Sequence, residues 1–173
     1  MVAPRILKFH LKLNLMVKSI ISFAAITLFI LFATSGGKNP AESKVGNLAP
    51  NMALVNSDTA MTLQQLRGRY VVITFWNSSQ PQTRIANMRH DRLAQSGQFT
   101  HVAINTDRSE RVFDELCRID GLDTSLEFHI DARQPLLREW KQDDEHLDTF
   151  VISPDGTIMS VNPVDETLLA LGR

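Results

Sequence analysis

The chain has 173 residues, of which 43% are hydrophobic and 21% charged, and this is the length and composition of about one globular domain. Four of its 18 Lys and Arg residues lie in residues 1–35, so the rest of the chain carries 14 basic against 19 acidic residues. Nucleic acid is therefore not expected as a partner, because its binding needs clustered Lys and Arg that displace counterions.

The first 35 residues have the pattern of an export signal. Residues 19–35 contain no charged side chain and are mostly apolar, and Lys18 precedes them. Two fates stay open: removal as a signal peptide, because small residues end the stretch, or retention as a membrane anchor, because it is long enough. Met16 is a second candidate start, since it begins a compact signal of its own. We predict an exported protein that is periplasmic or, through residues 19–35, tethered to the cell membrane.

A single domain is predicted after a short linker. Residues 36–46 are rich in Gly, Lys, Asn, Pro and Ser, which is typical of a linker, and residues 47–173 alternate between strand-like and helical patterns. The predicted elements, in chain order, are a strand over 52–56, a helical turn over 62–68, a strand over 70–76, a helix over 81–96, a strand over 99–105, a helix over 109–120, a strand over 128–131, a helix over 135–142, strands over 149–153 and 157–161, and a helix over 166–171. This order predicts an α/β sandwich with a central mixed β-sheet flanked by helices.

Local patterns specify two of these elements in more detail. The sequence Pro-Asp-Gly at 154–156, between two apolar runs, predicts the tight turn of a β-hairpin. In the helix predicted over 81–96, helical spacing favours Ile85, Met88 and Leu93 as the buried face.

Four stretches carry a resemblance to a known family. Residues 46–52 are similar to the opening Gly-x-x-Ala-Pro-x-Phe, 63–70 to Leu-x-x-Leu-x-Gly-Lys, 71–76 to Val-Val-Leu-x-Phe-Trp, and 149–156 to Thr-Phe-Leu-Ile-Asp-x-x-Gly. In this order the stretches resemble the exported thioredoxin-like proteins of the TlpA and ResA type, which are related to the peroxiredoxins (the redoxin and AhpC-TSA group). The resemblance covers residues 46–173 and implies a thioredoxin-like fold.

The residues that carry out the chemistry of this family are absent from the sequence. The family places Cys-x-x-Cys directly after the strand at 71–76, where a helix N-terminus stabilises a thiolate. Gln80 and Thr83 occupy these two positions, and neither an amide nor a threonine hydroxyl can attack a disulfide. A peroxidatic cysteine would belong at about the same place. Leu147 stands where the family has a cis-proline before Thr149, and a non-proline cis bond costs about 3–4 kcal/mol, so a trans loop is expected.

These two losses favour a redox-inactive relative that acts as a binding or accessory module for an envelope protein or peptide, without a cofactor. Its candidate cleft comprises Trp76, Asn77, Ser78, Ser79, Gln80 and Leu147. Two interpretations of the helix start stay open. Ser79 and Gln82 have the spacing of a capping box, with Pro81 in the first turn. Alternatively, free backbone amides there accept an anion or a peptide carbonyl.

Cys117 is the single cysteine, which excludes an internal disulfide, a cysteine-based zinc cluster and an intramolecular dithiol couple. It adjoins an apolar helix face that includes Phe113 and Leu116, so a core thiol is predicted, and Asp114 and Glu115 oppose its ionisation. The enzyme alternative, a thiol-disulfide oxidoreductase or a peroxiredoxin-like enzyme, would have to act through Cys117 or through thiols of a partner.

The remaining polar residues suggest no second centre. The five histidines lack the spacing of metal ligands, and acidic residues 143–145 are typical of a solvated loop, so no metal site is predicted. Ser78 or Ser79 with His90 and Asp91 has the residue types of a hydrolase triad, but His90 is expected more than two helical turns from either serine.

Overall fold

The computed structural model describes residues 44–131, 135–140, 142 and 146–172, and the predicted export signal and most of the linker lie outside them. The described residues belong to one compact unit. Within them, every helix is too short or too polar to cross a bilayer.

A five-stranded mixed sheet forms the centre of the domain, in the order β5-β4-β3-β6-β7. Its strands are β3 (Val71–Trp76), β4 (Thr100–Asn105), β5 (Glu127–His129), β6 (Thr149–Ile152) and β7 (Ile158–Val161). The β3-β4 and β4-β5 pairs are parallel, whereas β3-β6 and β6-β7 are antiparallel. The predicted α/β sandwich with a mixed sheet is confirmed.

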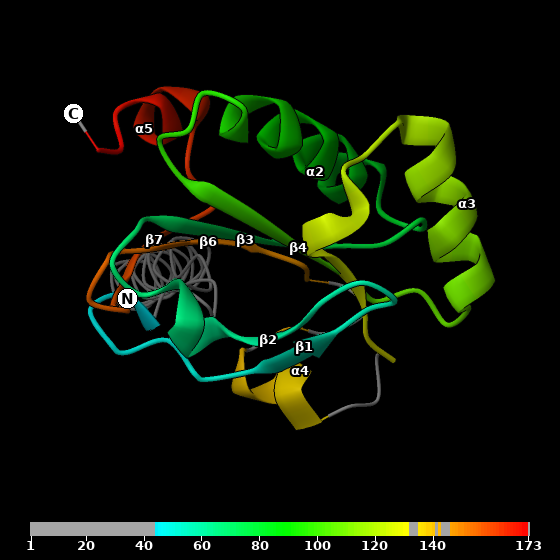
Figure 1. The fold of residues 1–173 in the computed structure, drawn as a ribbon, viewed down its shortest axis with the longest axis horizontal. Coiled ribbons are helices and arrows are strands. Elements are labelled where there is room, and N and C mark those ends of the chain that lie inside the picture. The colour runs from blue at the N-terminus through cyan, green and yellow to red at the C-terminus, as the bar shows by residue number, and fades with distance from the viewer. Residues whose placement is uncertain (1–43, 132–134, 141, 143–145, 173) are drawn as a thin grey trace, which may run out of the picture. The chain divides into compact units, whose positions relative to one another are not determined.

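Two layers cover the sheet (Figure 1). Helices α2 (Pro81–Ala94) and α5 (Asp165–Leu169) lie over one face, with α3 (Glu110–Asp120) beside them. The other face carries the two-stranded sheet and two short helical segments: β1 (Ala53–Val55), β2 (Ala60–Thr62), the 3-10 turn η2 (Leu63–Leu66) and α4 (Pro135–Glu139). A second 3-10 turn, η3 (Thr124–Leu126), precedes β5.

Strand β3 is buried along its whole length because both of its faces are covered. Successive side chains of a strand point to opposite faces. Val71, Ile73 and Phe75 accordingly join the main core under β1, η2 and α4, whereas Val72 packs with residues of α5. This explains the unbroken apolar run from which the strand was predicted.

The predicted hairpin turn is confirmed at β6-β7. The backbone N–H of Gly156 donates to the carbonyl of Ser153 at 2.8 Å, and that of Ser153 donates to Thr157 at 2.9 Å. Gly156 has a φ of +89°, a conformation that glycine adopts at little cost.

The predicted apolar face of α2 is only partly correct, because Leu93 packs against the core cluster of Val72 and Leu168 and Ile85 does not. Ile85 is 59% exposed, Met88 and Leu93 are only partly buried, and the buried residues of α2 are Asn87 and His90. Polar groups of the sheet hydrogen-bond to these two side chains, so a polar stripe of the helix faces inward. The spacing of apolar residues could not predict this polar stripe, because the method assumes that polar side chains face the solvent.

Candidate functional site

Three of the six predicted cleft residues meet at the end of the sheet where β3 and β4 finish. Asn77, Ser78 and Ser79, which connect β3 to α2, line a depression of about 410 Å³. Its opposite wall is the β4-α3 loop, with Thr106, Asp107, Arg108, Ser109 and Val112. Both parallel strands end here, so their connections to the following helices lie side by side.

The backbone donor of Ser78 is occupied by a side chain of the opposite wall. The Asp107 carboxylate accepts the N–H of Ser78 at 3.0 and 3.1 Å from its two oxygens, and the hydroxyl of Ser78 at 2.6 Å. Asn105 holds this carboxylate by donating its side-chain amide at 2.9 Å. The carboxylate therefore takes the place that an anionic ligand of this amide would need.

The next donors of the loop are also satisfied within the chain. Asn77 Oδ1 accepts the N–H of Gln80 at 3.0 Å and the hydroxyl of Ser79 at 2.9 Å. The Thr83 hydroxyl donates to the carbonyl of Gln80 at 2.9 Å and accepts the N–H of Asn77 at 3.4 Å. Asn77 thus shapes an Asx-type turn that leads the chain into α2.

This arrangement corrects the predicted capping box. The N-cap of α2 is Gln80, and Pro81 is the first helical residue, where its missing N–H costs nothing. Ser79 lies before the N-cap, and its hydroxyl turns back to Asn77. The alternative of free amides fails as well for Ser78 and Gln80, because their N–H groups already donate to side chains.

Trp76 and Leu147 lie apart from the depression. Trp76 is fully buried and packs on Phe113 with ring centroids 6.2 Å apart. Leu147 is 9% exposed and belongs to the main core. The peptide bonds of the described residues are all trans, including those at Leu147. The surface that a partner can reach is therefore formed by Ser78 to Gln80, because Asn77, Trp76 and Leu147 are buried.

Cys117 is a core thiol, as predicted. It is 3% exposed on α3 and packs with Trp76, Ala103 and Phe113. Burial raises its pKa to about 12, and the nearby carboxylates of Glu127, Asp114 and Asp120 add to the shift. Thiolate is the reactive form of cysteine, so at neutral pH this side chain is almost entirely unreactive.

Comparison with solved structures identifies the architecture. A thioredoxin-like protein from Parabacteroides distasonis superposes with a TM-score of 0.56 at 25% identity, over 72% of this chain and 90% of that one. The thioredoxin domain of a thiol-disulfide oxidoreductase from Bacteroides vulgatus gives 0.61 at 16% identity, over 72% and 92%. A thiol-disulfide oxidoreductase from Bacteroides fragilis gives 0.58 at 19%, over 70% and 94%. The chain has a thioredoxin-like fold of the TlpA type.

No family model and no curated protein matches the sequence. The structural comparison confirms the resemblance found in the four sequence stretches at the level of the fold. Sequence identities of 16 to 25% support a shared fold but not a shared activity. The activities in the names of those proteins are therefore not assigned to this chain.

The thioredoxin-like domain also holds a buried polar cluster that the sequence did not reveal. Under α2, the Thr74 hydroxyl lies 2.9 Å from His90 Nδ1 and 3.0 Å from His101 Nε2. Burial lowers the pKa of His90 to about 4 and that of His101 to about 3, so both rings are neutral at pH 7. His90 is therefore bound to Thr74 and not to Ser78 or Ser79, and a hydrolase triad does not form.

Glu127 is the second buried group that sequence reasoning missed. It is 2% exposed, and its carboxyl accepts the Asn87 side-chain amide at 2.8 Å and the Trp76 indole N–H at 3.2 Å. Burial raises its pKa to about 8, to which Asp91 and Asp120 contribute. The alternation of Glu127 and His129 with apolar Phe128 was the available signal, but it is equally typical of a solvated strand face.

No group of three or more His, Cys, Asp or Glu side chains with the geometry of a metal site occurs in the part of the chain that the structure describes. Acidic residues 143–145, which we expect to form a solvated loop, lie outside that part.

Proposed function

We propose that this protein is an exported thioredoxin-like domain without thiol-disulfide chemistry, which acts as a binding or accessory module in the cell envelope. Its partner is an envelope protein or peptide, and residues 19–35 attach it to the membrane if the signal is retained. The observation that carries this proposal is the start of α2, where Gln80 and Thr83 stand at the positions that the sequence resemblance assigns to the cysteines.

Two structural observations support the loss of redox chemistry. The thiol of Cys117 is buried on a different helix, with a pKa of about 12. The N–H of Gln80 is occupied by Asn77 Oδ1, and Thr83 uses its hydroxyl to hold the same loop. A helix start that is closed by its own side chains has no nucleophile to offer and few free donors for an incoming disulfide.

The depression at this loop is the surface that we assign to the partner. Ser78, Ser79 and Arg108 are exposed at its walls. The two serine hydroxyls already donate within the chain, so their oxygens are left as acceptors, and Arg108 supplies guanidinium donors. The loop is tied down by Asp107 and Asn77, so little conformational entropy is lost when a partner docks. A polar segment of an envelope protein or peptide suits this mixture of acceptors and guanidinium donors.

The redox part of the proposal is tested with disulfide reduction and peroxide consumption assays on the full-length protein. We expect no turnover above the background reaction. Turnover that disappears in Cys117→Ser would establish the enzyme alternative, a thiol-disulfide oxidoreductase or a peroxiredoxin-like enzyme that uses Cys117. Turnover that survives Cys117→Ser would contradict any thiol mechanism in this chain, because Cys117 is its single cysteine.

The partner surface is tested by placing a photo-crosslinking amino acid at Ser79 in the native host. A defined envelope protein should be captured there, whereas the same group at exposed Glu166, on α5, should not capture it. Ser78→Arg should abolish capture. Equal capture from both positions would contradict this surface.

Export is tested separately by cell fractionation. The protein should be found outside the cytoplasmic membrane or attached to it. Full-length chain in the cytosol, soluble and with residues 19–35 intact, would refute the envelope assignment.

A further inference from the structure

A second depression lies on a different part of the surface, between α3 and the β1-β2 turn. It has a volume of about 780 Å³, within the range of sites that hold small molecules. Its lining combines apolar and charged groups from four segments that are distant in the sequence: Val55, Glu110, Phe113, Asp114, Leu122 and Glu127. This depression shares no lining residue with the one described above.

The walls of this second depression are held in place by one asparagine. The side-chain amide of Asn56, in the β1-β2 turn, donates to the carbonyl of Thr124 at 3.1 Å and to that of Glu127 at 3.1 Å. Its Oδ1 accepts the N–H of Thr59 at 2.6 Å. The turn is thus fastened to η3 and to the start of β5.

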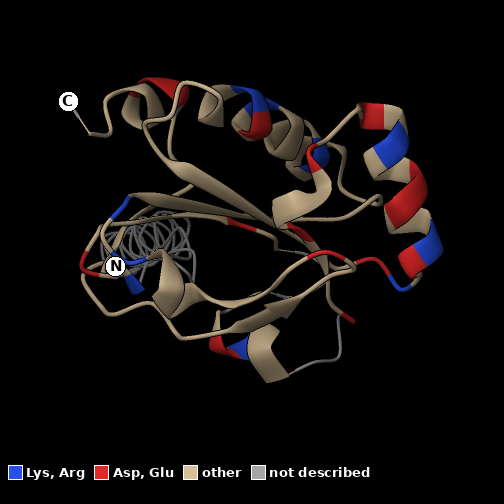
Figure 2. Ribbon diagram, viewed as in Figure 1, with Lys and Arg blue, Asp and Glu red and all other residues tan. Residues whose placement is uncertain are grey.

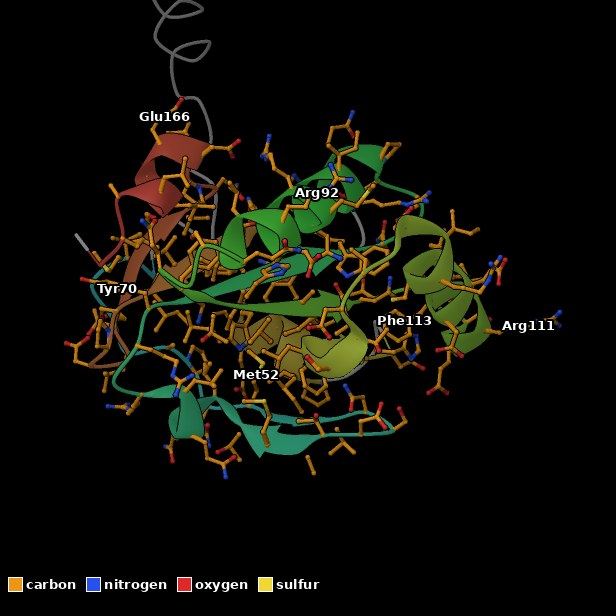
Figure 3. The ribbon with its side chains drawn as sticks, turned by 45° about the horizontal axis from the view of Figure 1, so that its top comes forward. Met52, Tyr70, Arg92, Arg111, Phe113 and Glu166 are labelled. Atoms are coloured by element: carbon orange, nitrogen blue, oxygen red, sulfur yellow. The ribbon has the colours of Figure 1, made fainter. Side chains whose placement is uncertain are left out.

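The inner surface is aromatic and apolar. Phe113 stacks on His129, with ring centroids 5.7 Å apart and an interplanar angle of 30°. Figure 3 shows Phe113 on the side of α3 that faces the sheet, whereas Arg111 points outward from the same helix. At the mouth, the apolar side chain of Val55 is 67% exposed. These groups offer contact to the carbon body of a ligand.

The charge of the lining is negative. Glu110 and Asp114 are exposed, and neither has an ion-pair partner among the residues that the structure describes. Arg118 also lines the depression, but its guanidinium is bound bidentately to Glu115 at 2.6 and 3.0 Å. Figure 2 shows this alternation of acidic and basic residues along α3. The two negative charges of Glu110 and Asp114 are larger than the roughly half positive charge of the dipole at the start of α3, so this part of the lining is negative.

We propose that the depression between α3 and the β1-β2 turn binds a small organic cation, an ammonium group carried on an aromatic or aliphatic body. The ammonium lies between Glu110 and Asp114, and the carbon body lies against Phe113 and Val55. An anion is repelled by the two carboxylates, and a neutral molecule leaves them without a counter-charge.

The first test is isothermal titration calorimetry with benzyltrimethylammonium, on full-length protein in a non-ionic detergent. Binding is expected, and it should weaken as NaCl is raised from about 0.05 to about 0.5 M, because salt screens exposed charges. Benzyl alcohol and phenylacetate serve as the neutral and the anionic probe. Binding of either control as tight as that of the cation, or no binding of the cation up to about 20 mM, would overturn the proposal.

The second test locates the site with variants. Glu110→Gln combined with Asp114→Asn should lower the affinity by about tenfold, since two exposed carboxylates contribute roughly 0.5–1 kcal/mol each. Glu166→Gln is the matched control, because Glu166 is an exposed acid in the first turn of α5 as Glu110 is in α3. All three substituted residues are exposed, so the variants should fold. Unchanged affinity in the double variant would place the cation elsewhere.

An independent readout comes from the two tryptophans. The Trp76 indole N–H donates to Glu127, which lines the depression, whereas Trp140 lies in the main core with Phe75 and Phe150. In a ¹H–¹⁵N spectrum the cation should shift the Trp76 indole signal and leave that of Trp140 unchanged. Trp76→Phe assigns the two signals. A shift of the Trp140 signal alone would contradict the location.

Discussion

The carboxylate of Asp107 holds Ser78 by accepting both its backbone N–H and its hydroxyl. The two residues are 29 positions apart and come from the loops that follow neighbouring parallel strands. Hydrogen bonds to an ionised acceptor are about twice as strong as those between neutral groups. This contact therefore fixes the loop before α2, at the place where the family resemblance expects a reactive thiol.

Asp107→Ala should destabilise the domain by about 0.5–1.5 kcal/mol, because the N–H and the hydroxyl of exposed Ser78 exchange a charged acceptor for water. Urea unfolding followed by circular dichroism measures the effect. Arg108→Ala is the control, since the neighbouring Arg108 is exposed on the same loop. Equal stability of the two variants would show that the Asp107–Ser78 contact contributes little.

Restoring cysteines at Gln80 and Thr83 should produce a reducible disulfide. Both side chains lie at the start of α2, where the helix dipole lowers the pKa of a thiol. The protein is oxidised, alkylated and weighed by mass spectrometry before and after reduction. If the double variant is folded and forms no intramolecular disulfide, the alignment of residues 79–84 with the family motif is wrong.

Leu147→Pro, added to that double variant, should raise disulfide-exchange activity only if the domain stays folded after the substitution. Leu147 is 9% exposed and packs in the main core, so the smaller proline ring also removes apolar contact. Activity and thermal unfolding are measured on the same sample. A gain in activity at unchanged stability would contradict the packing role assigned to Leu147.

The stability of the domain should be greatest near pH 6.5 and fall as the pH approaches 8. Burial lowers the pKa of His90 and His101 below their ordinary value of 6.5, so the unfolded state binds more protons from about pH 4 to 6.5, and stability rises with pH there. The pKa of Glu127 is raised from 4.5 to about 8, so between these pH values the folded state binds one more proton there than the unfolded state. Below pH 6.5 the two histidines outweigh this effect, and above pH 6.5 Glu127 alone makes stability fall.

Glu127→Gln should remove the fall between pH 6.5 and 8, which for one proton is about 1.4 kcal/mol per pH unit. The amide can replace the carboxyl without a lost hydrogen bond. Asn87 Oδ1 has no partner among the described residues, so a flip of the Asn87 amide would present this oxygen to the new NH₂ group. Denaturation curves from pH 5 to 9 check this, with Glu166→Gln as control. A fall that persists in Glu127→Gln would assign it to another group.

The ion pair between Arg84 and Asp120 should stabilise the contact of α2 with α3. The guanidinium donates to both carboxylate oxygens at 2.6 and 2.7 Å, and the Asp120 side chain is 5% exposed. Arg84→Met leaves that carboxylate buried and unpaired, so a loss of about 1–3 kcal/mol is expected, with Arg84 itself partly exposed. The exposed pair of Arg118 and Glu115 provides the control, and Arg118→Met should cost less stability than Arg84→Met, because water screens an exposed pair. A larger loss in the control would contradict this order.

The sequence by itself determined the strands, the main helices and the hairpin, because these depend on local patterns. The unbroken apolar run of β3 and the Pro-Asp-Gly turn each specify their own backbone conformation. The single cysteine and the polar residues at 80 and 83 likewise appear in the sequence without any structure. β2 was not predicted, since three residues are too few for a periodic pattern.

Only the tertiary structure decided which polar side chains are buried and which donors are occupied. His90 and Asn87 face inward because Thr74 and Glu127, 16 and 40 residues away, satisfy their hydrogen bonds. Asp107 reaches Ser78 from another loop. The Ser79 hydroxyl donates to Asn77 and Gln80 is the N-cap, so the capping box predicted at Ser79 does not form. A buried polar group is stable only with a partner, and such partners lie far along the chain. Their pairing is therefore invisible until the sheet has brought the segments together.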